Sequence, residues 1–100
     1  MTGAFGAIPA AIDTSSSTES GISTDMAATT AAGAAALTGV APMAADSDSA
    51  QFAAALNAVG AAYLASASDH VTQRDAFAGA QTLASGTYGA MDAIHSTVLG

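Results

Sequence analysis

The chain has 100 residues, no cysteine, no tryptophan and a single basic residue, Arg74. The absence of cysteine excludes a disulfide framework and any thiolate metal site. A net charge of −7 argues strongly against nucleic-acid binding, because one guanidinium cannot neutralise a phosphate backbone. The same charge argues against binding to an anionic membrane surface.

Large apolar residues are also scarce, with three Phe, two Tyr and four Met. Hydrophobic residues make up 51% of the chain, but most of them are alanine. Alanine is the best helix former. Its small side chain buries little apolar area, and each Å² buried stabilises the fold by only roughly 25 cal/mol. The composition therefore predicts one domain of long helices with a thin core, and a thin core on a short chain suggests that a partner supplies stability.

The only two prolines, Pro9 and Pro42, frame the predicted elements. Pro42 lies in a stretch with helix-stop and turn signals, and Asp48 is a predicted helix cap with Gln51 at the reciprocal position. We expect a first helix over about 10–38, a turn over 39–47 and a second helix over about 48–90. The predicted fold is all-α, an antiparallel helical hairpin that completes a four-helix-bundle-like heterodimer with a partner hairpin.

The second predicted helix carries a heptad repeat that is bulky in its first half. Two companion columns make the repeat: Leu56, Tyr63, His70, Phe77, Ala84, Met91 and Val98, and Phe52, Val59, Ser66, Gln73, Ala80, Thr87 and Ile94. Because a hairpin covers only one stripe of each helix, a second apolar stripe is expected to stay open for a partner. We predict that the partner-binding residues are Phe52, Leu56, Val59, Tyr63 and Phe77.

The first predicted helix has a sparser apolar stripe and a run of hydroxyl side chains. Serine and threonine lower helix propensity, so residues 13–24 are expected to be frayed or irregular. Arg74 points away from its neighbour Asp75 on a helix, and an acidic group on a partner is one possible contact for it.

No pattern in the chain predicts catalysis, a metal site or a cofactor. The sequence has no G-x-S-x-G elbow, and no strand precedes a glycine-rich phosphate loop. Asp46 and Asp48 begin like a calcium loop, but the required glycine and terminal glutamate are missing. Asp92 and His95 lack a further ligand nearby. The chain is therefore predicted not to be an enzyme, with no catalytic residue and no metal.

Tyr88 and Asp92 form a polar pair four residues apart near the C-terminus. One helical turn separates them, so both side chains are expected on one face. Tyr88 falls outside the two heptad columns given above. Gly86 and Gly89 each weaken a helix by roughly 1 kcal/mol relative to alanine, so we expect this stretch to be mobile until bound. A tyrosine outside the core stripe, followed by a carboxylate, favours a recognition surface over packing.

These features together resemble the mycobacterial PE family over roughly residues 8–95. The residues that carry the resemblance are Val40-Ala41-Pro42-Met43-Ala44-Ala45-Asp46, Ser49-Ala50-Gln51, Gly60, Leu64-Ala65-Ser66, Ala78-Gly79, and Thr87-Tyr88 with Asp92, which matches the Y-x-x-x-D/E secretion motif of the family. Pro9 is followed by Ala10, where the pair that names the family has glutamate.

The resemblance implies a PPE protein as partner in an elongated helical bundle. An EspG-type chaperone would bind through the PPE partner, and the ATPase of a type VII (ESX) system would export the folded pair. Tyr88 and Asp92 would be the secretion signal. The protein would reach the exterior or the cell surface without a cleaved signal peptide, in agreement with an N-terminus that lacks a basic segment.

Two alternatives stay open at this point. One is a self-associating Esp-type substrate of the same machinery, acting at the envelope or outside the cell. The other is membrane insertion through residues 26–45, which are uncharged but only weakly apolar.

Overall fold

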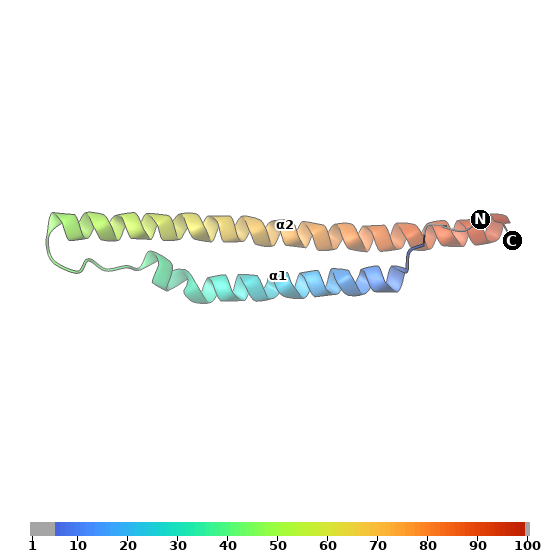
Figure 1. Cartoon of the computed structure of the whole chain (residues 1–100), viewed down its shortest axis with the longest axis horizontal. Helices are drawn as coiled ribbons and strands as arrows, with labels where there is room; N and C mark the ends of the chain where they lie inside the picture. Colours follow the sequence, from blue (N-terminus) through green and yellow to red (C-terminus); the bar gives the residue numbers. More distant parts are fainter. Residues whose placement is uncertain (1–5, 100) are drawn as a thin grey trace. The chain divides into compact units, whose positions relative to one another are not determined.

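The computed structural model describes residues 6–99, and these form two α-helices and no strand. Helix α1 is Pro9–Thr38 and helix α2 is Ser47–Leu99 (Figure 1). This confirms the predicted all-α hairpin. The second helix continues past residue 90, where the sequence analysis ends it, and includes both Gly86 and Gly89.

Contacts divide the hairpin into two compact units. The first joins the chain up to Ile22 to the chain from Arg74 onwards, and the second is Ser23–Gln73. Each unit contains a segment of both helices and is described by itself below.

Helix α1 begins at its proline and is unbroken. The carbonyl of Ile8 accepts the amides of Ala11 at 3.0 Å and Ile12 at 3.2 Å, so Pro9 stands at the first helical position. Proline is favoured there because its missing N–H would have no helical partner.

The expectation that residues 13–24 are frayed or irregular is wrong, because this stretch is helical throughout. Its hydroxyls are used in ways that do not break the helix. Thr14 and Thr18 each donate at 3.0 Å to the carbonyl four residues earlier. Ser16 and Ser23 instead point across to α2 and are buried.

The turn between the helices is held by one side-chain amide. Asn57 accepts the amide of Val40 at 2.8 Å and donates to the carbonyl of the same residue at 3.1 Å. A primary amide can replace one backbone pair in this way because it carries both a donor and an acceptor.

Gly60 allows the end of α1 to approach α2 closely. A Cβ built on Gly60 would lie 1.9 Å from the carbonyl oxygen of Leu37 and 2.7 Å from its carbonyl carbon. The obstacle is backbone, so a larger residue at position 60 requires the helices to move apart.

The cap of α2 differs from the prediction. Asp46, not Asp48, is the cap: its carboxylate accepts the amide of Ser49 at 2.7 Å and the hydroxyl of Ser49 at 3.1 Å. Gln51 donates to the Ser47 hydroxyl at 3.1 Å and makes no reciprocal capping bond there. Asp48 lies in the first turn, where a carboxylate favours the positive end of the helix dipole.

Small and polar side chains close each unit. The buried side chains of the described residues are Ala53, Ala78, Ser16, Ser23 and Ser85. In the first unit, the Ser16 hydroxyl donates to the Ala78 carbonyl at 2.7 Å, and Ser85 donates to the Pro9 carbonyl at 3.0 Å. In the second unit, Ser23 is 1% exposed and donates to the Val71 carbonyl at 3.3 Å.

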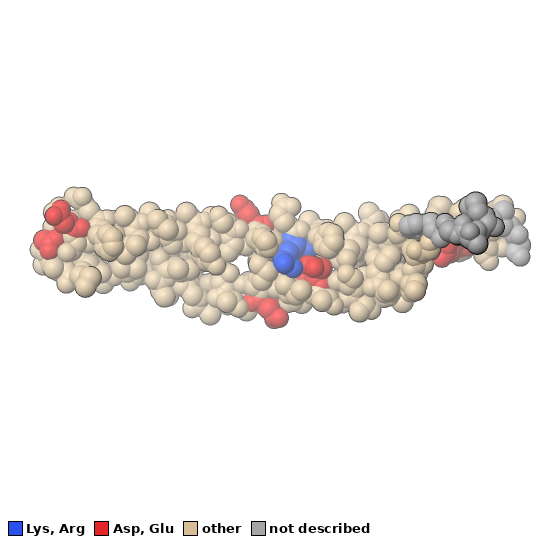
Figure 2. Space-filling model, in the orientation of Figure 1, with Lys and Arg blue, Asp and Glu red and all other residues tan. Residues whose placement is uncertain are grey.

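Arg74 forms an ion pair within the chain. The sequence analysis had considered only an acidic group on a partner. Its guanidinium lies 2.9 Å from the carboxylate of Glu19, with both side chains partly exposed. Figure 2 shows this basic group in contact with an acidic one.

Candidate partner and export surfaces

The face of α2 that packs on α1 is different from the bulky heptad columns read from the sequence. The inward positions, all buried or half-buried, also repeat every seven residues: Ala53, Gly60 and Ala67 with Asn57, Leu64 and Val71 in the second unit, and Arg74 and Gln81 with Ala78 and Ser85 in the first. We call these the inner columns. Small residues there let the helix axes approach each other, which leaves the large side chains on the outside.

Four of the five predicted partner-binding residues form one exposed stripe in the second unit. This outer stripe consists of Phe52, Leu56, Val59 and Tyr63, spaced by three or four residues along α2. Phe52 is 62% exposed and Tyr63 is 58% exposed. In the first unit, Phe77 is also exposed. A run of large apolar side chains in water is typical of a protein-binding surface.

A shallow groove lies beside the outer stripe. It has a volume of about 390 Å³ and is lined by Tyr63 and by small residues of α1, including Thr29, Gly33 and Ala36. A groove flanked by large side chains is typical of a helix-binding surface, because a further helix can insert its own side chains into the groove.

The predicted export residues lie on the inner columns of α2. Tyr88 is seven residues after Gln81, and Asp92 is seven residues after Ser85. The sequence analysis placed Tyr88 outside the two bulky columns, and the structure adds where it lies instead. It falls outside the bulky columns but in line with the face that α1 covers earlier along α2.

At this point α2 has run past the start of α1. The last inner-column hydrogen bond joins Ser85 to Pro9, the first residue of α1 (Figure 1). Tyr88 is 37% exposed, and Asp92 and His95 are exposed. Tyr88, Asp92 and His95 continue the inner columns of α2 beyond Ser85. The end of α2 therefore exposes the same face that α1 covers earlier along the helix.

The carboxylates that the sequence analysis considered as metal ligands are not grouped around a common point in the part of the chain that the structure describes. Asp46 is occupied as the helix cap, and the hydrogen bonds from the Ser49 amide and hydroxyl lower its pKa. Across residues 6–99, no three His, Cys, Asp or Glu side chains are grouped as they would be around a metal ion. In the same range, neither helix contains a stretch long and apolar enough to span a bilayer.

Sequence reasoning missed the residues that close the hairpin. Asn57 and the buried serines were not singled out, and Gly60 was noted only for the family resemblance. A second repeat of seven, made mostly of small and polar residues, nevertheless runs one position away from the bulky one. It also missed an apolar pocket at the turn, lined in part by Val40, Met43 and Phe52.

Comparison with known proteins gives one result. No curated protein and no solved structure matches the chain. The model of the PE family matches residues 6–95, which is nearly the whole chain and includes the turn, the outer stripe and the Tyr88–Asp92 pair. This confirms the resemblance read from the sequence, and the chain belongs to the PE family.

Proposed function

We propose that the chain is a non-enzymatic interaction subunit that pairs with a PPE protein and is exported as a folded heterodimer by a type VII (ESX) system. The observation that carries this proposal is the exposed outer stripe. Four large apolar side chains lie in water on a hairpin whose own buried side chains are alanine and serine.

The energetic argument follows from side-chain size. Burying a large apolar side chain contributes about 1.5–3 kcal/mol, whereas alanine contributes much less. The hairpin buries Ala53 and Ala78, while Phe52, Val59 and Tyr63 remain largely exposed. A partner that covers the outer stripe would therefore bury large apolar side chains that the hairpin leaves in water.

The export signal in this proposal is the Tyr88–Asp92 pair. An aromatic ring and a carboxylate one turn apart, on a face past the start of α1, give a directional surface that an ATPase or its adaptor can read on a folded cargo. An EspG-type chaperone would bind the PPE partner. The heterodimer would then reach the cell surface or the exterior without a cleaved signal peptide.

Expression of the chain with and without a PPE protein tests the pairing. The probe is a PPE protein, taken from the neighbouring reading frame where that frame encodes one. We expect a poorly folded or aggregating chain alone, and a soluble helical complex after co-expression. A stable, cooperatively melting homo-oligomer formed by the chain alone would contradict the proposal and favour the self-associating Esp-type alternative.

A pair of charge substitutions tests the surface itself. Val59→Asp places a carboxylate within the outer stripe, and Leu83→Asp is the matched control at another exposed apolar position, outside the stripe and the inner columns. We expect Val59→Asp to weaken pairing at least about tenfold, because a charge would be desolvated at the interface. Equal affinity of the two variants would count against this interface.

A further inference from the structure

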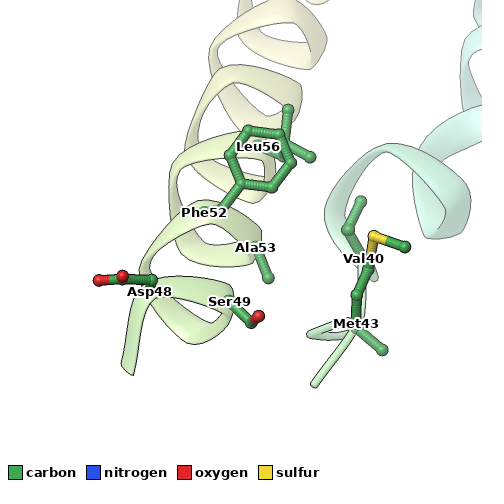
Figure 3. A pocket seen from close by; sticks show the side chains of 8 residues that line it. Val40, Met43, Asp48, Ser49, Phe52, Ala53 and Leu56 are labelled. Carbon is green, nitrogen blue, oxygen red and sulfur yellow. The ribbon is translucent and has the colours of Figure 1, made fainter. Parts of the chain in front are cut away.

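The end of the second unit contains a pocket that shares Phe52 and Leu56 with the outer stripe and extends beyond the stripe to the turn. The pocket lies between the turn and the first three turns of α2, and has a volume of about 320 Å³. Val40 and Met43 form its wall on the turn, and Phe52, Ala53 and Leu56 belong to its wall on α2 (Figure 3). We call it the turn pocket.

The turn pocket is apolar and open to solvent. Met43 is 95% exposed and Phe52 is 62% exposed. Ligand pockets typically span about 300–1,000 Å³, so a space at the lower limit fits one or two side chains rather than a cofactor. Methionine suits such a wall because its flexible thioether adapts to the shape of an incoming group.

Hydrogen bonds hold the backbone on both walls of the pocket. Asn57 holds Val40 through two hydrogen bonds, and Asp46 caps α2 through Ser49. Ser49 also lines the pocket. A preformed pocket binds more tightly because less conformational freedom is lost on association.

The charge around the pocket selects its occupant. Asp48 lines the pocket, with its carboxylate pointing away from Met43 (Figure 3). Asp46 is hydrogen bonded to Ser49, another lining residue, and Figure 2 shows acidic groups gathered at this end. The single basic residue of the chain, Arg74, is not in the second unit and pairs with Glu19. The second unit has no lysine or arginine to offset these carboxylates, so a cationic group on a partner is favoured and an acidic one is repelled.

We propose that the turn pocket receives one large apolar side chain of the partner protein, and that a lysine or arginine next to this side chain meets Asp48. This inference rests on the proposed pairing with a helical partner. It adds a second point of recognition, at the turn, which fixes how far the partner extends along α2.

Because the chain has no cysteine, single thiols can report on the pocket in the co-purified heterodimer. Met43→Cys places a thiol in the turn pocket, Val59→Cys places one in the outer stripe, and Leu83→Cys is a control outside both. All three side chains are exposed in the hairpin, so within the heterodimer we expect a polar maleimide to alkylate positions 43 and 59 at least about tenfold more slowly than position 83.

The three positions separate the two proposals. Protection at position 59 without protection at position 43 overturns the pocket and leaves the pairing surface intact. Protection at neither position overturns the proposed pairing together with the pocket. Equal protection at positions 43 and 83 also overturns the pocket, because the effect would not be specific to it.

The charge is tested separately, by association kinetics. When the chain and the PPE protein are refolded together from urea, Asp48→Asn should slow assembly of the heterodimer by a few-fold at low salt, and the difference should shrink as salt rises. Asp69→Asn, also exposed and in the second unit, is the matched control. Equal rates for the two variants at low salt would overturn the assignment of a basic group to the partner.

Discussion

At the scale of single residues, Gly60 sets how closely α1 and α2 approach at the turn. Gly60→Ala would place a methyl group against the Leu37 carbonyl, and backbone cannot rotate away as a side chain can. We expect the free energy of unfolding of the paired protein to fall by about 1–3 kcal/mol, as for other overpacked sites. Urea unfolding at a fixed protein concentration measures this.

The control for that substitution is Gly79→Ala, on the same helix. A Cβ at Gly79 meets nothing within 4 Å, so this variant should gain up to about 1 kcal/mol from helix propensity. If both variants were equally stable, the close approach at Gly60 would not be a constraint.

Asp46 makes the cap of α2 dependent on pH. The hydrogen bonds from Ser49 lower its pKa below that of the unfolded chain, so they stabilise the folded state at neutral pH. This contribution is present above about pH 4, the ordinary range for aspartate, and is lost as the pH falls through the lowered pKa of the folded state.

Melting temperatures between acidic and neutral pH test this effect. Asp46→Asn, which keeps an acceptor but no charge, should show a smaller loss of stability on acidification than the parent, and Asp69→Asn should behave like the parent. An Asp46→Asn protein with the acid sensitivity of the parent would contradict the role of this carboxylate.

The sequence predicted the general use of these residue types but not always the right residue. Asp46 and Asp48 are both acceptable caps two positions apart, and only the course of the turn decides between them. Tyr88 was predicted to belong to a secretion signal, and that stays a prediction. Its position relative to α1 could not be predicted, because it depends on where the inner columns lie.

At the scale of elements, the ion pair between Arg74 and Glu19 links α2 to α1 within the first unit. The pair is 2.9 Å long but partly exposed, so solvent screens it. We expect a coupling free energy of about 0.5–1 kcal/mol from a double-mutant cycle with Arg74→Met and Glu19→Gln. Additive single-variant effects would mean that the pair does not stabilise the hairpin.

The two helices themselves were predicted well, because alanine content, the turn at Pro42 and the heptad repeat all act locally. The serine-rich stretch was not. Its propensity argues against a helix, but Ser16 and Ser23 find acceptors on α2, and sequence alone does not show which helix will face them.

At the scale of the whole molecule, two faces of α2 have different roles: one packs on α1, and the other is proposed to bind the partner. The inner columns carry small and polar side chains, and the bulky repeat is left outside. The sequence identified the bulky repeat correctly and left it unclear which repeat closes the hairpin, because both have a period of seven. Membership of the PE family agrees with a subunit that completes its core with another protein.

The central claim is that this chain is an exported partner subunit whose signal is the Tyr88–Asp92 pair. The most direct measurement uses an ESX-competent cell that expresses the Tyr88→Ala chain with the PPE protein. The amount of the heterodimer is measured inside the cell and outside it. Met91→Ala, an exposed neighbour on the same stretch of α2, is the control. We predict that the Tyr88→Ala heterodimer forms normally, accumulates inside and is not exported, whereas Met91→Ala is exported like the parent. Normal export of the Tyr88→Ala pair would contradict the account.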